Sequence, residues 1–164
     1  MQVRAATRDD APSIARIYNE GIEDRQATFE TEPRTAADVL SWFDDEVPVV
    51  VAEVDGEVAA WSSAPAYSPR AAYAGVREFS IYVARDLRGS GLGAPTLRAL
   101  IDVCERRGFW KLVSRVFPEN EASLALCRSV GFREVGVYRR HARLDGRWRD
   151  VVVVERLLGA AAAD

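Results

Sequence analysis

Apolar residues recur at intervals of three and four in four stretches of the chain, which is the spacing of an amphipathic helix. The first two stretches begin with the capping-box patterns Thr7–Asp10 and Thr35–Asp38. The third ends at Gly108, and the fourth spans Asn120–Val130. These patterns predict four helices. The apolar positions that carry the first three are Ala11, Ile14, Ala15, Tyr18 and Ile22, then Val39, Leu40, Trp42 and Phe43, then Leu97, Leu100, Ile101 and Cys104.

Runs rich in β-branched and aromatic residues predict strands between these helices. Two Asp-Gly turns indicate hairpins, in which residues 47–54 pair with 58–66 and residues 133–143 pair with 148–158. Further strands are predicted at residues 3–6, 77–83 and 112–116. The order β-α-α-β-β-β-α-β-α-β-β is typical of a mixed α/β fold built in layers. Its early antiparallel hairpins argue against a doubly wound parallel sheet.

The length of 164 residues fits one domain. We find neither an internal repeat nor an interdomain linker, and we expect a single domain over residues 1–158. The alanine-rich segment 159–164 is expected to be a frayed, disordered tail.

Composition narrows the function classes. The 22 basic and 25 acidic residues give a net charge of −3, which argues against a nucleic-acid binder held by phosphate neutralisation. Two cysteines and one histidine exclude a disulfide scaffold and a zinc finger, and we expect no metal. No apolar run approaches the length of a membrane span, and the first residues lack an apolar signal segment. We therefore expect a cytoplasmic protein with no membrane partner.

The most informative segment is a glycine-rich turn between a predicted strand and a predicted helix, Arg88-Gly-Ser-Gly-Leu-Gly93. Its glycines let successive backbone N–H groups turn inward beside a helix N-terminus, which makes an anion site suited to a pyrophosphate. The alternative interpretation is a flexible turn that binds no ligand. A nucleotide kinase loop is excluded because no lysine follows the glycines. An NADP-binding unit stays open, since Arg115 could meet a 2′-phosphate, but too little chain follows for a doubly wound sheet.

Three elements together resemble the Gcn5-related (GNAT) N-acetyltransferases: Ile81-Tyr-Val83, then Arg88-x-x-Gly91-x-Gly93, then Asn120-x-x-Ser123 followed by Gly131-Phe132. The resemblance covers nearly the whole chain. It implies the acyl-CoA N-acyltransferase fold, with a mixed, mostly antiparallel sheet and helices on both faces.

The same resemblance implies acetyl-CoA as co-substrate. The backbone of Ile81, Tyr82 and Val83 would pair with the pantetheine arm, and Asn120 would contact that arm or a water near the thioester. The amide of Val83 would face the developing oxyanion. The pyrophosphate would lie in the loop formed by Arg88, Gly89, Ser90, Gly91, Leu92, Gly93 and Ala94.

Four further segments, Ala27–Glu30, Arg70-x-x-Tyr73, Glu78–Val83 and Gly146–Asp150, are together similar to the phosphinothricin N-acetyltransferases of that superfamily. Two others, Tyr73–Ser80 and Phe109–Arg115, look closest to the branch that acetylates arsinothricin. The resemblance implies acetylation of the α-amine of phosphinothricin, arsinothricin or methionine sulfoximine, a role in toxin resistance, and a homodimer. The apolar strand Val151–Val154 is either part of the dimer interface or a buried central strand.

A protonated amine must lose a proton before it attacks a thioester, and Glu78 is our candidate general base, acting directly or through a water. The alternative is a surface glutamate paired with an arginine. Arg70 and Tyr73 suit a phosphinate or carboxylate, or else they belong to a solvated loop. By resemblance, Phe29 and Glu30 line the acceptor mouth, although Phe29 equally fits a core anchor.

Two positions depart from the family pattern. Cys127 stands where related enzymes often carry Tyr or His to protonate the leaving thiolate, and we interpret it as a small residue on a helix face rather than a nucleophile. Arg77 stands where an apolar residue is usual, and it either faces outward or adds a cation for a doubly charged acceptor. His141 is interpreted as part of a polar hairpin face.

Other functions stay open at this point. The acceptor could be a protein N-terminus or a polyamine, although a polyamine fits poorly beside arginines because like charges repel. The chain could also be a non-catalytic module that senses acetyl-CoA.

Overall fold

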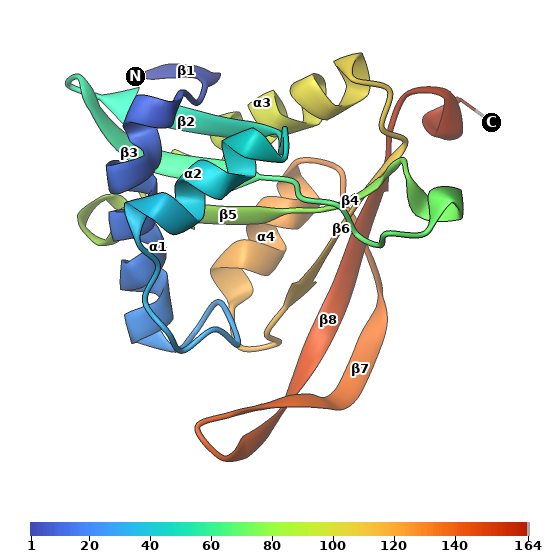
Figure 1. Ribbon diagram of the computed structural model, residues 1–164. Helices are drawn as coiled ribbons and strands as arrows, with labels where there is room; N and C mark the ends of the chain where they lie inside the picture. The colour runs from blue at the N-terminus through green and yellow to red at the C-terminus, as the bar shows by residue number, and fades with distance from the viewer. Residues whose placement is uncertain (164) are drawn as a thin grey trace.

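The computed structural model describes residues 1–163, and it confirms the four predicted helices and both predicted hairpins (Figure 1). The helices are α1 (Ala11–Asp24), α2 (Ala36–Asp44), α3 (Gly93–Arg106) and α4 (Glu121–Ser129). The strands are β1 (Gln2–Ala5), β2 (Val49–Val54), β3 (Glu57–Ser63), β4 (Val76–Glu78), β5 (Ser80–Val83), β6 (Lys111–Val116), β7 (Arg133–Leu144) and β8 (Arg147–Leu157).

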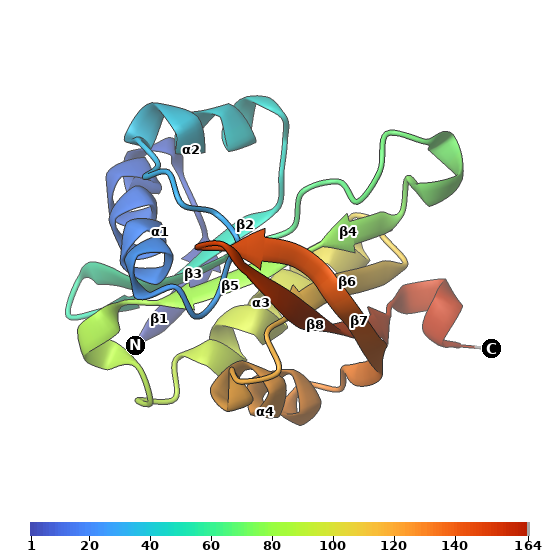
Figure 2. The ribbon, with the colours of Figure 1, turned by 90° about the horizontal axis from the view of Figure 1, so that it is seen from below.

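The strands form two four-stranded sheets, ordered β1-β2-β3-β5 and β4-β6-β8-β7. Only β4 and β6 run parallel among the paired strands described, so the sheet system is mixed and mostly antiparallel, as predicted. Helices α1 and α2 cover one face of the first sheet, and α3 lies on the other face beside α4 (Figure 2). Alternation along β2 explains this layering, because Val49 and Val51 join the core under α1 and α2 while Val50 joins the core under α3.

One strand is divided where the sequence predicts continuity. Residues 77–83 form β4 and β5, which are separated at the buried residue Phe79. The N–H of Phe79 still donates to Val113 O of β6 at 2.9 Å, but from Ser80 onward the chain pairs with β3 instead. The hydroxyl of Ser114 donates to Phe79 O at 2.9 Å. The two sheets therefore part at Phe79, and β5 and β6 diverge beyond it.

The apolar strand β8 is a central strand of the second sheet, between β6 and β7. Val151, Val152 and Val154 are buried in it, which decides between the two alternatives for this segment. The exposed large apolar side chains of the hairpin are Val135, Val137 and Tyr138 of β7, together with Trp148 and Leu157 of β8.

The end of the chain is more ordered than the sequence predicts. Leu158 is fully buried, and Gly159–Ala162 form a turn of 3-10 helix whose first N–H donates to Glu105 Oε1 at 3.3 Å. That anchor and that hydrogen bond replace the expected frayed tail over these residues, while Asp164 lies outside the described residues. No helix in the described chain is long and apolar enough to cross a membrane.

Candidate active site

The divergence of β5 and β6 opens two adjoining hollows. One, which we call the inner cavity, has a volume of about 440 Å³ and lies between β4, β5, β6 and the loop over residues 27–30. The other, which we call the loop groove, has a volume of about 570 Å³ and runs along β5 to the glycine-rich turn. Both are lined by Ala27, Ile81, Tyr82, Asn120 and Ser123, so they form one continuous cleft.

The backbone of β5 presents free hydrogen-bonding groups to this cleft. In an antiparallel pair, alternate residues point their N–H and C=O groups at the partner strand. Ala84 N donates to Ala59 O of β3, so by alternation Tyr82 also faces β3 while Ile81 and Val83 face away from it. The Tyr82 side chain stacks on Tyr18 and Trp61, and its burial raises the pKa of its hydroxyl. Because its backbone groups face β3 and its ring is stacked, Tyr82 lines the cleft without offering it a free backbone group.

The glycine-rich turn has the conformation of an anion-binding loop. Gly89 and Gly91 have φ values of +79° and +87°, a left-handed backbone that other residues adopt only under strain. They lead through Leu92 into α3, a helix of 14 residues that begins at the third glycine. Gly93 has a different requirement, because a Cβ there would come within 2.9 Å of Leu126 Cδ2 on α4. Two glycines therefore shape the loop, and the third allows the two helices to approach closely.

Ion pairs hold this loop against α1. Arg88 Nη1 lies 2.5 Å from Asp24 Oδ2, and Arg85 Nη2 lies 2.9 Å from Asp24 Oδ1. These two guanidinium groups hold the pKa of Asp24 below its usual range. The Nε of Arg88 also donates to Val83 O at 3.4 Å. Arg88 thus connects the loop both to α1 and to the open side of β5.

Asn120 lies where the loop groove meets the inner cavity. Its Oδ1 accepts from Ser123 N at 3.2 Å and so caps α4, while its Nδ2 donates to Gln26 O at 3.3 Å. The side chain therefore fixes the start of α4 and the loop opposite it. Both segments border the cleft.

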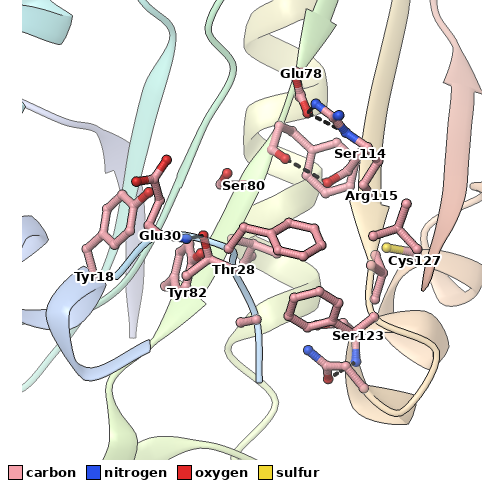
Figure 3. Close-up of a pocket in the computed structure, with 18 of the residues that line it drawn as sticks. Tyr18, Thr28, Glu30, Glu78, Ser80, Tyr82, Ser114, Arg115, Ser123 and Cys127 are labelled. Atoms are coloured by element: carbon pink, nitrogen blue, oxygen red, sulfur yellow. Dashed lines mark hydrogen bonds and ion pairs between the residues drawn. The ribbon is translucent and has the colours of Figure 1, made fainter. Parts of the chain in front are cut away.

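Glu78 projects into the inner cavity and is paired there with an arginine (Figure 3). Arg115 of β6 reaches it through Nη2 at 2.5 Å and Nε at 3.1 Å, both to Oε1. The parallel pairing of β4 with β6 explains this contact, because Glu78 is level with Val113 and Arg115 is the next β6 residue on the same face. Glu78 therefore has features of both sequence interpretations. It lines a cavity, as a general base would, and it is paired with an arginine, as the alternative predicted.

Residues 27–30 close the inner cavity from the other side. Phe29 packs edge-on against Phe117 with ring centres 4.9 Å apart, so it anchors its loop as well as lining the cavity. Glu30 also lines the cavity, and its Oε2 lies 2.8 Å from Arg34 Nη2. The cavity is bordered by two carboxylates, from Glu30 and Glu78.

Three residues predicted to bind the acceptor do not line the inner cavity. Arg70 and Tyr73 belong to an exposed loop with one 3-10 turn, where Tyr73 packs edge-on against Tyr67. Arg77 lies on the side of β4 opposite to Glu78, with its guanidinium 4.6 Å from the Phe109 ring centre. Its Nε donates to Ala64 O at 2.7 Å, and burial lowers its pKa.

Cys127 and His141 both lie where their sequence interpretations put them. Cys127 is buried on α4 beside the inner cavity, and burial raises the pKa of its thiol to about 11. A thiol that stays protonated is neither a nucleophile nor an effective acid toward a thiolate of lower pKa. His141 is exposed on β7, as expected for a polar hairpin face, and its Nε2 lies 3.2 Å from Arg115 Nη1. Among residues 1–163, no three His, Cys, Asp or Glu side chains gather into a metal-binding group.

From the sequence, Arg115 is a candidate contact for a nucleotide phosphate and the last residue of the matching segment Phe109–Arg115, and its contact with Glu78 was not predicted. The signal was present in the order of the strands. A short buried strand after a crossover helix pairs in parallel with the strand before that helix, which brings position 115 next to position 78. Tyr18, Ser114 and Phe117 also line the inner cavity and were not predicted to.

An anion-binding glycine loop, a split sheet and a carboxylate-lined cavity at the split define a transferase of the acyl-CoA type. A model of the acetyltransferase (GNAT) family matches residues 14–132, and the chain belongs to that family. It is therefore an N-acetyltransferase, in agreement with the family resemblance of its motifs.

Relatives with assigned activities match almost end to end. The chain is 36% identical to phosphinothricin N-acetyltransferase of Alcaligenes faecalis, over 96% of this chain and 83% of that protein. It is 32% identical to the L-methionine sulfoximine/L-methionine sulfone acetyltransferase of Pseudomonas aeruginosa, over 93% and 92% of the two chains. The structure of a phosphinothricin acetyltransferase from Sinorhizobium meliloti in complex with acetyl-CoA superimposes with a TM-score of 0.91 at 32% identity, covering 99% of this chain and 91% of that one.

Proposed function

We propose that this enzyme transfers the acetyl group of acetyl-CoA to the α-amine of a small anionic amino-acid analogue of the phosphinothricin, arsinothricin or methionine sulfoximine type. The observation that carries the proposal is the Glu78–Arg115 pair at the head of a cleft that continues into a glycine loop. A carboxylate that can take a proton and a guanidinium that can bind an anion are the two groups that such an acceptor requires. The named activities of the relatives support the same acceptor class.

The residues of the loop groove fit acetyl-CoA. The open backbone groups of Ile81 and the open N–H of Val83 suit the amides of the pantetheine arm, and the left-handed glycines with the start of α3 suit the pyrophosphate. The acetyl-CoA held by the Sinorhizobium meliloti relative supports this assignment. When bound, acetyl-CoA supplies an acetyl group already activated as a thioester.

The proposed transfer is direct, with no acyl-enzyme. The amine nitrogen forms a bond to the acetyl carbon, the carbon–sulfur bond breaks, and CoA leaves as the thiolate. Glu78 takes the proton that the ammonium group loses before attack, directly or through a water, and the second proton, which the nitrogen loses after the new bond forms, passes to solvent. In this scheme the amide of Val83, which faces away from β3, donates to the carbonyl oxygen as negative charge develops there. Cys127, with a thiol pKa of about 11, takes no part in this scheme.

The acceptor would enter past Phe29 and Glu30. Arg70 and Tyr73 lie outside the inner cavity of their own chain, so a role for them requires a second copy that brings this loop to the cavity. The exposed Val135, Val137 and Tyr138 of β7 offer an apolar surface for such a homodimer. Light scattering at several protein concentrations tests the assembly. If the protein is a dimer whose Arg70→Ala variant keeps the wild-type KM for the acceptor, the role of Arg70 is rejected.

The acceptor class is tested by thiol release from acetyl-CoA with a panel of amines. We expect release with phosphinothricin, arsinothricin or methionine sulfoximine, and little with spermidine or a peptide N-terminus. In cells, acetylation of a toxic amino-acid analogue of this type would also protect against it. Release with the peptide alone would support the alternative function of modifying a protein N-terminus. Acetyl-CoA binding without release for any amine would support a sensor.

A further inference from the structure

Arg115 differs from the other residues of the inner cavity in its positive charge. Within the part of the chain that the structure describes, it is the one basic side chain among the residues lining that cavity. It lies between two groups, with Glu78 Oε1 2.5 Å from its Nη2 and His141 Nε2 3.2 Å from its Nη1. Figure 3 shows its guanidinium beside Glu78 at the end of the cavity away from Tyr82 and Thr28.

We propose that Arg115 is the residue that binds the anionic group of the acceptor and selects for it, and that it does so by exchanging Glu78 for that group. This inference rests on the proposed function and names the specificity residue of the same site. The cavity borders also carry the carboxylates of Glu30 and Glu78, which repel an anion. An acceptor phosphinate or carboxylate therefore has one favourable partner there, and a guanidinium fork binds such a group through two hydrogen bonds.

The exchange couples recognition to reaction. Both hydrogen bonds from Arg115 now end on Glu78 Oε1, so this oxygen is engaged in the pair. An acceptor anion that takes over the guanidinium releases that oxygen, which then accepts the proton of the amine. An amine without an anionic group leaves the Glu78–Arg115 pair intact. The arrangement thus favours amino-acid analogues over simple amines in both binding and proton transfer.

His141 positions the guanidinium for this exchange. It lies within an irregular segment of β7, where the pairing with β8 shifts between Tyr138 and Ala142 and Arg140 has a φ of +48°. The N–H of Arg140 donates to Asp150 Oδ1 at 2.7 Å, which fixes the segment. Because arginine can only donate, the contact with Arg115 requires His141 Nε2 to be an unprotonated acceptor. When Glu78 is released, His141 still holds one side of Arg115.

The test compares acceptors on the intact enzyme. Initial rates are measured with phosphinothricin and with its neutral ester-amide analogue, which keeps the α-amine but lacks both acidic groups. For Arg115→Ala we expect the KM for phosphinothricin to rise about 10- to 100-fold, with the KM for the neutral analogue nearly unchanged. For Arg115→Lys, which keeps the charge but not the planar fork, the KM for phosphinothricin should lie between those of the wild type and of Arg115→Ala. Arg128→Ala, an exposed arginine paired with Glu134 on the enzyme surface, is the matched control and should behave as wild type.

A second pair of variants tests the positioning role. His141→Ala should raise the KM for phosphinothricin by about threefold without lowering kcat, and His141→Gln, which keeps an acceptor oxygen, should restore it. Acetyl-CoA affinity, measured by calorimetry, should stay at the wild-type value in every variant, which shows that each one folds.

The outcomes separate two failures. If the wild-type enzyme acetylates no anionic amine, the proposed function itself is wrong. If it acetylates phosphinothricin but Arg115→Ala or Arg115→Lys changes the KM values for both acceptors equally or leaves both unchanged, Arg115 is not the specificity residue and the inference is overturned.

Discussion

The loop groove and the inner cavity adjoin each other but are built in different ways. Much of the loop groove comes from one continuous stretch, Ile81–Ala94, and the proposed contacts with acetyl-CoA there are mainly to backbone groups. The inner cavity is assembled from α1, the loop over residues 27–30, both halves of the divided strand, β6 and α4, and its chemistry lies in side chains. A backbone site needs the right local conformation, whereas a side-chain site needs the whole fold.

Because of this difference, substitutions in the two regions should affect different steps of the reaction. We expect the loop groove to depend mainly on the left-handed conformation of Gly89 and Gly91. The inner cavity depends on a few charged groups, above all Glu78 and Arg115, whose contact is set by the pairing of β4 with β6. Changes in the first region should therefore alter acetyl-CoA affinity, and changes in the second should alter turnover and acceptor choice.

The largest expected effect comes from Glu78→Gln. This change keeps the shape of the side chain but removes the proton acceptor, so kcat should fall about 100-fold while the affinity for acetyl-CoA stays unchanged. Steady-state kinetics and calorimetry on the same preparation measure both quantities. Glu134→Gln, which alters an exposed glutamate paired with Arg128, is the control. An unchanged kcat for Glu78→Gln would remove Glu78 from the mechanism.

The next effect tests the backbone character of the loop groove. Gly91→Ala forces an alanine to adopt a φ of +87°, which costs about 1–2 kcal/mol, so the loop relaxes and acetyl-CoA should bind about tenfold more weakly. Gly56→Ala provides a matched control, because Gly56 has a φ of +81° in the distant turn between β2 and β3 and no atom within 4 Å of an added Cβ. Both variants should lose stability, but only Gly91→Ala should lose affinity. Equal affinities would contradict the assignment of the loop.

A smaller effect is expected at Gly93, where the requirement is space rather than backbone conformation. Gly93→Ala places a methyl group 2.9 Å from Leu126 Cδ2, so α3 and α4 should pack less well, with a loss of about 1 kcal/mol in the free energy of unfolding. Adding Leu126→Ala should relieve the clash and reduce the additional loss caused by Gly93→Ala. Urea denaturation of the four members of the cycle measures this coupling. Strict additivity of the two changes would show that the contact does not matter.

The smallest effect on activity is expected at Cys127. With a thiol pKa of about 11, this residue is protonated at neutral pH, and Cys127→Ala should keep kcat within about twofold of wild type. Because the thiolate forms only as the pH rises toward the thiol pKa, alkylation by iodoacetamide should be slow at neutral pH and accelerate in strongly alkaline solution. Mass spectrometry of the alkylated peptide measures this rate. Rapid labelling at neutral pH would contradict the buried, protonated thiol.

The sequence predicts the two regions unequally. The helices, the hairpins and the glycine turn follow from local patterns, and the structure confirms them because each depends on neighbours in the chain. The break at Phe79 has no local signal, since it depends on which strands pair with the two halves. The burial of Val151–Val154 is likewise decided by the place of β8 between two other strands.

The candidate site shows the same limit. Phe29 and Glu30, assigned by family resemblance, and Glu78, chosen as a carboxylate that can accept a proton, all line the inner cavity. Arg70 and Tyr73, chosen for their anion-binding groups, and Arg77, which departs from the family pattern, do not line that cavity in one chain. The pairing of Arg115 with Glu78 joins positions 37 residues apart, and only the parallel register of β4 and β6 reveals it.

The most direct measurement of the whole account is the stoichiometry of a single turnover. Enzyme in excess is mixed with acetyl-CoA and phosphinothricin, and released thiol, N-acetylated acceptor and acetylated protein are quantified together. The account predicts one acetylated acceptor for each thiol released, no acetylated protein, and no thiol release when the acceptor is omitted. Acetylated protein that appears before the product, or thiol release without an acceptor, would contradict direct transfer between two substrates in one continuous cleft.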